Sequence, residues 1–101
     1  MDKIHHVAVQ VTDLQETINW YKEEFNCEVS YEDDSWALIK FDNVSLALVL
    51  PEQHPMHFAI ESAEAEKYGD LVKHRDGTAS IYIKDPSGNS VELLKLAEDD
   101  V

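Results

Sequence analysis

Two histidines and one glutamate stand out because their chemistry and their places in the sequence suit a metal ion. His6 and His57 each lie near the start of a β-rich run, and Glu92 lies in the last such run. Two imidazoles and one carboxylate can hold one face of an octahedral divalent ion and leave the other positions open for substrate or oxygen. We therefore take these three residues as candidate metal ligands.

The alternation of side chains along the strands favours this set. In the segment 4–11, His6 lies on the strand face opposite Val7 and Val9, which we expect to pack against a helix. Glu92 alternates with apolar neighbours, so it points away from the apolar layer behind the sheet. The neighbours of His57 also point away from its own face, so all three candidates can share one face.

The residue pattern in the first half of the chain predicts one helix and four strands. Thr12 followed by Gln15 is typical of a capping box, and apolar residues recur at helical spacing through 13–25. The four strands are expected over 4–11, 28–33, 36–41 and 44–50.

The second half repeats this order with one strand fewer. We expect a strand over 56–60, a helix over 63–74 that Ser62 caps and Gly77 ends, and strands over 79–84 and 90–96. The turn Asp85-Pro86-Ser87-Gly88 joins these last two strands into a hairpin, in which Tyr82 and Glu92 should lie close together on one face.

A weak internal repeat relates the two halves. A shift of 51 residues places His57 on His6, and a shift of 45 places Glu92 on Ala47. The chain therefore reads as a single α+β domain of paired modules, βαβββ over about 1–50 and a shortened βαββ over about 51–101.

Composition narrows the classes of partner and compartment. The 101 residues include 21 acidic and 8 basic side chains, giving a net charge of −13. Such a surface repels nucleic acid and anionic membranes. No apolar run is long enough for a membrane span or a signal peptide, and the single cysteine, Cys27, fits a reducing compartment. We expect a cytoplasmic protein.

Three segments, 4–14, 56–60 and 85–93, resemble the vicinal oxygen chelate superfamily. This superfamily includes glyoxalase I, fosfomycin-resistance proteins, bleomycin-resistance proteins and extradiol dioxygenases. The resemblance implies paired βαβββ modules whose mixed sheet curves into a cup around a metal. It also implies that His6, His57 and Glu92 take the positions of family ligands.

The chain departs from the family pattern at two points. In glyoxalase I, which this pattern resembles, the metal has four protein ligands, and the fourth is a carboxylate on the last strand of the first module. This chain has Ala47 at that position. The missing strand of the second module is an outer edge in the family, so its loss should trim the cup and spare the metal.

A finer match concerns the residues from Val72 to Glu92, which resemble the extradiol ring-cleavage signature. In that family, the residues that match His74 and Tyr82 lie beside the metal and assist catecholate and oxygen chemistry. The alternative is that His74 ends a helix at the surface and Tyr82 is a wall residue. Gln10, Trp36 and Lys40 could line the cup, with Lys40 as the interior cation for an anionic ligand.

The leading hypothesis is an enzyme that chelates a small oxygenated substrate on Fe(II) or Mn(II), with Zn²⁺ as the alternative ion. A dioxygenase-like reaction is one form of it, and a lyase of the glyoxalase type or a fosfomycin-resistance-like enzyme are others. The rival hypothesis is a metal-free binding protein like the bleomycin-resistance proteins. We also expect a homodimer, since a partner can cover an open sheet edge and a half-closed cup.

Overall fold

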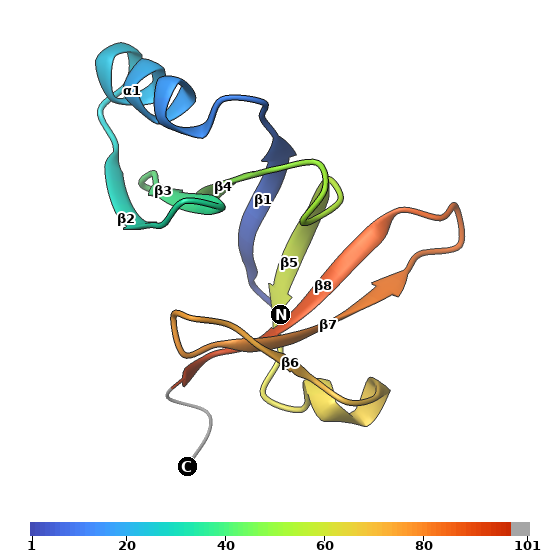
Figure 1. The fold of residues 1–101 in the computed structure, drawn as a ribbon. Helices are drawn as coiled ribbons and strands as arrows, with labels where there is room; N and C mark the ends of the chain where they lie inside the picture. Colours follow the sequence, from blue (N-terminus) through green and yellow to red (C-terminus); the bar gives the residue numbers. More distant parts are fainter. Residues whose placement is uncertain (98–101) are drawn as a thin grey trace. The chain divides into compact units, whose positions relative to one another are not determined.

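The computed structural model describes residues 1–97, which fall into two compact units (Figure 1). The N-terminal unit is His6–Met56. The C-terminal unit is Met1–His5 together with the chain from His57 onwards. The expectation that the two modules make a single domain stays a prediction.

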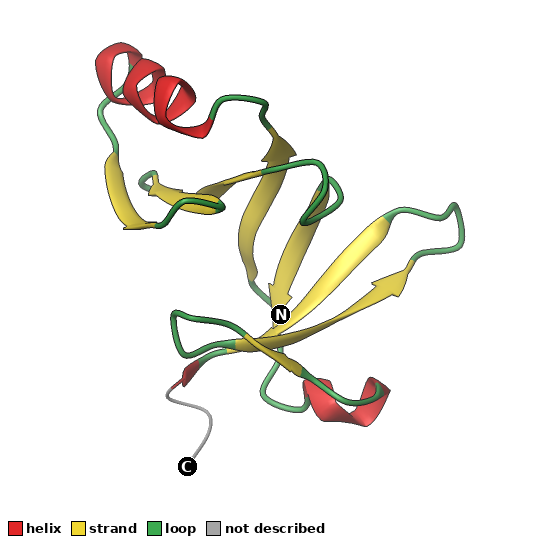
Figure 2. Ribbon diagram, in the orientation of Figure 1, coloured by secondary structure: helices red, strands yellow, loops and turns green. Residues whose placement is uncertain are grey.

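The N-terminal unit contains one helix and a mixed four-stranded sheet (Figure 2). Its sheet order is β2-β3-β4-β1, with β1 parallel to β4 and the other pairs antiparallel. Its elements are β1 (Ile4–Gln10, whose first two residues belong to the C-terminal unit), α1 (Leu14–Glu24), β2 (Glu28–Glu32), β3 (Trp36–Lys40) and β4 (Ser45–Val49).

Helix α1 begins one residue later than the sequence predicted. The N-cap is Asp13, not Thr12, because the Asp13 side chain accepts a hydrogen bond of 3.0 Å from the backbone N–H of Glu16. A carboxylate at this position also interacts favourably with the positive end of the helix dipole.

The core of the N-terminal unit forms where α1 packs on the sheet. Ile18 of the helix contacts Ile39 and Leu48, and Val9 and Val11 pack against the same cluster. The prediction that the valines of the first strand meet a helix is therefore confirmed for Val9 and Val11, whereas Val7 is 39% exposed and lies outside this cluster. The opposite face of β1, which carries His6, is left for other contacts.

The C-terminal unit repeats the order of the first sheet, as β5-β8-β7-β6. β5 is parallel to β8, and the other two pairs are antiparallel. Its elements are β5 (His57–Glu61), the 3-10 helix η1 (Ala65–Tyr68), β6 (Val72–Lys73), β7 (Ala79–Lys84) and β8 (Ser90–Lys95).

Two predictions for this half are wrong. The helix over 63–74 is replaced by the single turn η1, and the strand that we expected to be missing is present as the two-residue β6. Gly69 ends η1 with a φ of 142°, which a helix cannot continue. Val72, a β-branched residue, then pairs with Ser80 of β7.

The turn between β7 and β8 sets the register of the strands that carry Tyr82 and Glu92. The Asp85 carboxylate accepts hydrogen bonds from the backbone N–H groups of Ser87 and Asn89, at 3.0 and 2.8 Å. Gly88 supplies a φ of 86°, and the turn places Tyr82 directly opposite Glu92. The predicted hairpin is confirmed.

The predicted α+β class is confirmed, because each unit has a mixed sheet and the N-terminal unit adds the helix. Within residues 1–97, no helix is both long and apolar enough to cross a membrane.

Candidate metal centre

The strand registers confirm the internal repeat. In the N-terminal unit Ala8 of β1 lies opposite Ala47 of β4, and in the C-terminal unit Ala59 of β5 lies opposite Glu92 of β8. Both predicted shifts, 51 for the first strand of each module and 45 for the last, follow from these pairs. The N-terminal unit therefore has a methyl group where the C-terminal unit has a carboxylate.

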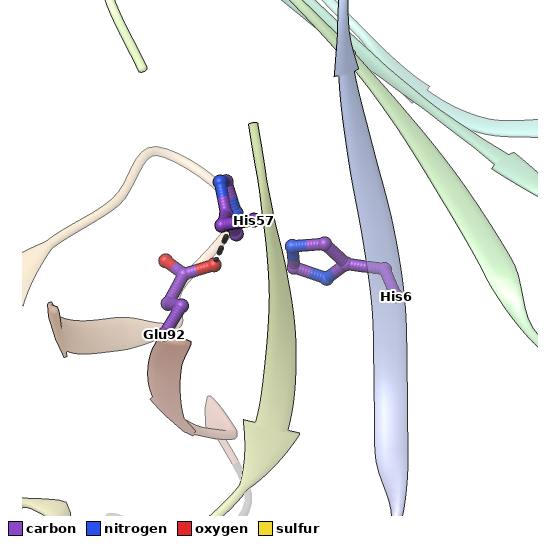
Figure 3. Close-up of side chains that lie close together, drawn as sticks. All are labelled: His6, His57 and Glu92. Carbon is purple, nitrogen blue, oxygen red and sulfur yellow. Dashed lines mark hydrogen bonds and ion pairs between the residues drawn. The ribbon is translucent and has the colours of Figure 1, made fainter. Parts of the chain in front are cut away.

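Glu92 is the polar centre of the C-terminal unit. It is 4% exposed, although a carboxylate is costly to bury without partners. His57 Nε2 donates to Glu92 Oε1 at 3.0 Å, as Figure 3 shows, and the Ser80 hydroxyl donates to Oε2 at 2.6 Å. Both carboxylate oxygens are therefore engaged, each by a different residue.

Tyr82 lies beside this pair, as its position in the hairpin predicted. Its hydroxyl is 3.4 Å from both ring nitrogens of His57, and the two rings are almost perpendicular with centroids 4.9 Å apart. Burial, followed by the negative charge of Glu92, raises the pKa of Tyr82 above its usual value. A phenol with the usual pKa of about 10 is already protonated at neutral pH, so the Tyr82 hydroxyl can act as a hydrogen-bond donor there.

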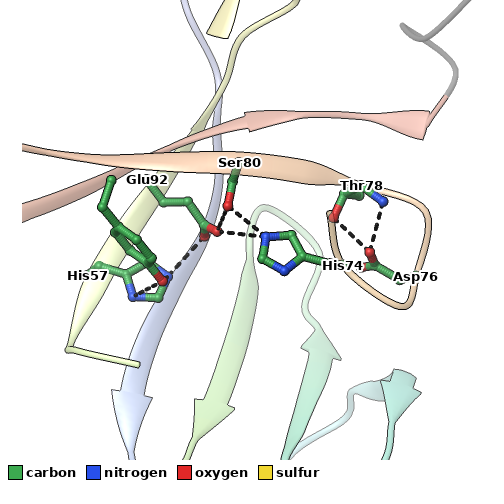
Figure 4. Close-up of polar contacts among 7 residues, drawn as sticks. His57, His74, Asp76, Thr78, Ser80 and Glu92 are labelled. Carbon is green, nitrogen blue, oxygen red and sulfur yellow. Dashed lines mark hydrogen bonds and ion pairs between the residues drawn. The ribbon is translucent and has the colours of Figure 1, made fainter. Parts of the chain in front are cut away.

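His74 also reaches the carboxylate, although it follows a strand and not a helix. Its Nε2 lies 2.6 Å from Ser80 Oγ and 3.6 Å from Glu92 Oε2 (Figure 4). The His74 backbone N–H donates to the Thr78 carbonyl at 2.8 Å, and Asp76 accepts from both the Thr78 N–H and hydroxyl. This tight turn holds the backbone at His74, and the contacts with Ser80 and Glu92 orient the imidazole. The alternative of a surface histidine at a helix end is wrong.

His6 lies on β1 in the N-terminal unit, and like His57 it is 6% exposed. Its neighbours across the sheet are Ser45 of β4 and then Lys40 of β3. His6, His57 and Glu92 are all buried and each offers one ligand atom to a metal ion.

The three residues predicted to line the cup belong to the N-terminal unit. Trp36 stacks on Tyr31 with centroids 4.4 Å apart, and the Gln10 side chain donates to the His54 carbonyl at 3.0 Å. Gln10 and Trp36 lie in one row across the sheet, since both are in register with Val49. Lys40 shares this face by alternation but is exposed, so the expectation of an interior cation is wrong.

Ser80 is the residue that the sequence analysis missed. It is 2% exposed and contacts both His74 and Glu92. Its position gave a signal, because Ser80 precedes Tyr82 by two residues on the same strand and so shares its face.

The donor set fits a divalent ion. Adjacent ligand atoms on an octahedral ion with bonds of about 2.1 Å lie about 3.0 Å apart. His57 Nε2 and Glu92 Oε1 have this separation, 3.0 Å. Imidazole and carboxylate donors suit Fe(II), Mn(II) or Zn(II), and the buried surroundings limit competition from water.

Comparison with known proteins identifies relatives along most of the sequence. The family model described as "Glyoxalase/Bleomycin resistance protein/Dioxygenase superfamily" matches residues 3–93. The metallothiol transferase FosB of Staphylococcus saprophyticus is 28% identical, in an alignment that covers 92% of this chain and 76% of that protein.

Several solved structures share the fold. Methylmalonyl-CoA epimerase from Streptomyces coelicolor has a TM-score of 0.77 at 18% identity, covering 94% of this chain and 97% of that one. The Mycobacterium tuberculosis epimerase has a TM-score of 0.73 at 18% identity, with 94% and 88% covered. At these identities the likeness concerns the fold alone.

Proposed function

The chain belongs to the glyoxalase/bleomycin resistance protein/dioxygenase superfamily, and from this premise we propose that it is a divalent-metal-dependent enzyme acting on a small oxygenated substrate. The observation that carries the proposal is the buried Glu92 carboxylate, whose Oε1 lies 3.0 Å from His57 Nε2. Imidazole and carboxylate donors buried this close together can ligate one divalent ion, and in the metal-free protein they hydrogen-bond to each other. The likeness to a metallothiol transferase also supports a metal-dependent enzyme.

The proposed ligands are His6, His57 and Glu92. His6 completes the set because the repeat makes it the equivalent of His57, and because it is a buried imidazole. Fe(II) or Mn(II) is the favoured ion and Zn(II) the alternative. When bound, the ion would supply a Lewis acid that polarises substrate oxygens, or a site for oxygen if it is redox-active.

Tyr82 and His74 are the proposed catalytic residues. The Tyr82 phenol is protonated at neutral pH, as an ordinary tyrosine is, and its place beside His57 lets it donate a hydrogen bond to a substrate oxygen there. His74 lies 3.6 Å from the Glu92 carboxylate, within reach of the same centre. Gln10 and Trp36, on the face of β1 and β3 that also carries His6, are proposed substrate contacts, with Lys40 at the exposed end of β3.

The finer proposal is a dioxygenase-like reaction, which the spacing of His74, Tyr82 and Glu92 supports. A lyase of the glyoxalase type is less favoured, since this chain has Ala47 at the position where such enzymes have a fourth, carboxylate ligand to the metal. We also propose a homodimer in the cytoplasm, as the family resemblance and the single cysteine suggest.

Elemental analysis tests the metal proposal. Protein purified without a metal-affinity tag, then dialysed with Mn²⁺, Fe²⁺ or Zn²⁺, should retain about one ion per chain. His57→Ala should lose it, while His54→Ala, the same change outside the proposed ligand set, should retain it. Wild-type protein that stays empty after all three ions would favour the metal-free binding alternative.

A substrate panel tests the reaction class. Protein loaded anaerobically with Fe(II) should convert one or more catechols to yellow ring-cleavage products when oxygen is admitted. Tyr82→Phe should lower this activity at least about tenfold, the scale of a lost acid–base group. Fully loaded protein that leaves every catechol unchanged would refute the dioxygenase proposal. Conversion of a thiol and a small electrophile would then point to a transferase.

A further inference from the structure

We infer that Ser80 is a positioning residue that turns the Glu92 carboxylate so that Oε1 faces the metal and Oε2 does not. This inference rests on the proposed function, because it concerns how one proposed ligand is held. It adds a residue outside the ligand set and predicts that Glu92 binds the ion through one oxygen.

The strand ladder places Ser80 beside Glu92. Ser80 lies opposite Leu94, and Glu92 lies opposite Tyr82, so Ser80 and Glu92 are diagonal neighbours on one face of the hairpin. Ser80 is 2% exposed, and its Oγ lies 2.6 Å from Glu92 Oε2. A short contact between a hydroxyl and a buried carboxylate is a strong hydrogen bond.

The hydrogen-bond count around Ser80 leaves one arrangement. A serine hydroxyl carries one proton, and an ionised carboxylate only accepts, so Ser80 must donate to Glu92 Oε2. His74 Nε2, also 2.6 Å from Ser80 Oγ, must then donate its N–H to that oxygen. The result is a directed chain from His74 through Ser80 to Oε2.

This chain directs Oε1, not Oε2, toward His57, the neighbouring proposed ligand. Oε2 accepts the hydrogen bond from the Ser80 hydroxyl and lies 3.6 Å from His74 Nε2, whereas Oε1 faces His57. At the far end, the 2.8 Å bond from the His74 backbone N–H to the Thr78 carbonyl holds the backbone that carries this imidazole. Outer partners of this kind orient metal ligands in many proteins.

The N-terminal unit provides an internal comparison. By register, Leu38 takes the place of Tyr82, and Trp36 takes the place of Ser80, because Trp36 lies opposite Val49 as Ser80 lies opposite Leu94. The unit with Ala47 in place of the carboxylate thus also lacks the hydroxyl. If the fold of the module required a serine at this position, both units would have one. The hydroxyl and the carboxylate instead occur together in the C-terminal unit.

A matched pair of variants tests the role of the hydroxyl. Ser80→Thr and Ser80→Val add nearly the same volume to the buried site and differ in whether a hydroxyl is present. Calorimetric titration with Mn²⁺ should give a dissociation constant at least about tenfold weaker for Ser80→Val, and close to wild type for Ser80→Thr. Ser90→Ala is the control, because Ser90 is another buried serine of this sheet whose hydroxyl contacts Lys84.

Infrared difference spectra supply a readout that a packing role would not move. Wild-type protein with Mn²⁺ should show the wide carboxylate band splitting of one-oxygen ligation, and Ser80→Ala should narrow it as Oε2 becomes free to bind. Ser80→Thr and Ser80→Val proteins with equal affinities, or an unchanged splitting in Ser80→Ala, would overturn the inference alone. Wild-type protein that binds no Mn²⁺ would overturn the proposed function and the inference with it.

Discussion

Replacing Glu92 by glutamine separates its role in metal binding from its role in the fold. The amide has the shape of the carboxylate, and its oxygen can accept from Ser80 while its N–H donates to the other tautomer of His57. The metal-free variant should therefore keep its fold, with a free energy of unfolding within about 1–2 kcal/mol of wild type. The negative charge that would face the ion is lost.

The size of the effect on metal binding follows from this lost charge. Removing one partner of a buried charge pair costs about 3–5 kcal/mol, and each 1.4 kcal/mol is about tenfold in affinity. We therefore expect Glu92→Gln to weaken binding at least about 100-fold. At an ion concentration 100 times the wild-type dissociation constant, the ion stabilises wild type by about 2.7 kcal/mol and the variant by about 0.4 kcal/mol at most.

Thermal unfolding with and without Mn²⁺ measures this difference. For a domain of this size, 1 kcal/mol moves the Tm by about 4–8 °C, so the ion should raise the wild-type Tm by roughly 10–20 °C. The rise in Glu92→Gln should be roughly 3 °C or less. Glu28→Gln, which removes the same charge from exposed strand β2, should respond like wild type. Equal rises in wild type and Glu92→Gln would refute a ligand role for Glu92.

Three further predictions concern the phenol, a turn and the assembly. Because the pKa of Tyr82 is raised in the folded state, its contribution to the free energy of unfolding should fall as the pH rises above about 10, where unfolded tyrosine ionises. Denaturation measured at several pH values should therefore show a steeper alkaline loss of stability in wild type than in Tyr82→Phe. Gly69→Ala should lower the free energy of unfolding, measured in urea, by about 1–2 kcal/mol, since the φ of Gly69 is 142° and a Cβ there would lie 2.9 Å from the Ile81 side chain. Light scattering should give a dimer mass, and a monomer mass at every concentration would contradict the homodimer.

Most of the strand pattern could be predicted from the sequence because alternation and turn residues are local signals. The strand over 79–84 has the predicted bounds, and the others differ by one or two residues. The pairing of Tyr82 with Glu92 also followed from parity and the Asp85–Gly88 turn. These predictions needed no knowledge of long-range packing.

The errors arose where a local signal had two solutions. Ala65, Tyr68, Leu71 and Val72 have helical spacing, but the chain leaves the helix after one turn. Ala65 is buried against Val91 and Leu93, and Leu71 packs against the same cluster, while Tyr68 and Val72 are exposed. Two of the four apolar residues therefore meet the core without a continuous helical stripe. The contact between Ser80 and Glu92 was missed because a hydroxyl carries no distinctive spacing.

Side chains at equivalent strand positions of the two units differ in polarity. Ser80, Tyr82 and Glu92 of the C-terminal unit correspond to Trp36, Leu38 and Ala47 of the N-terminal unit, so three polar side chains are matched by apolar ones. The histidine of the first strand is the exception, since it is present in both as His6 and His57. Within its own unit, His6 lies in a strand whose next residue on that face, Ala8, packs in an apolar cluster with Ala47 and Val49. Among these four compared positions, the histidine is thus the one that keeps its polar side chain in both modules, whereas the carboxylate and its partners occur in the C-terminal unit.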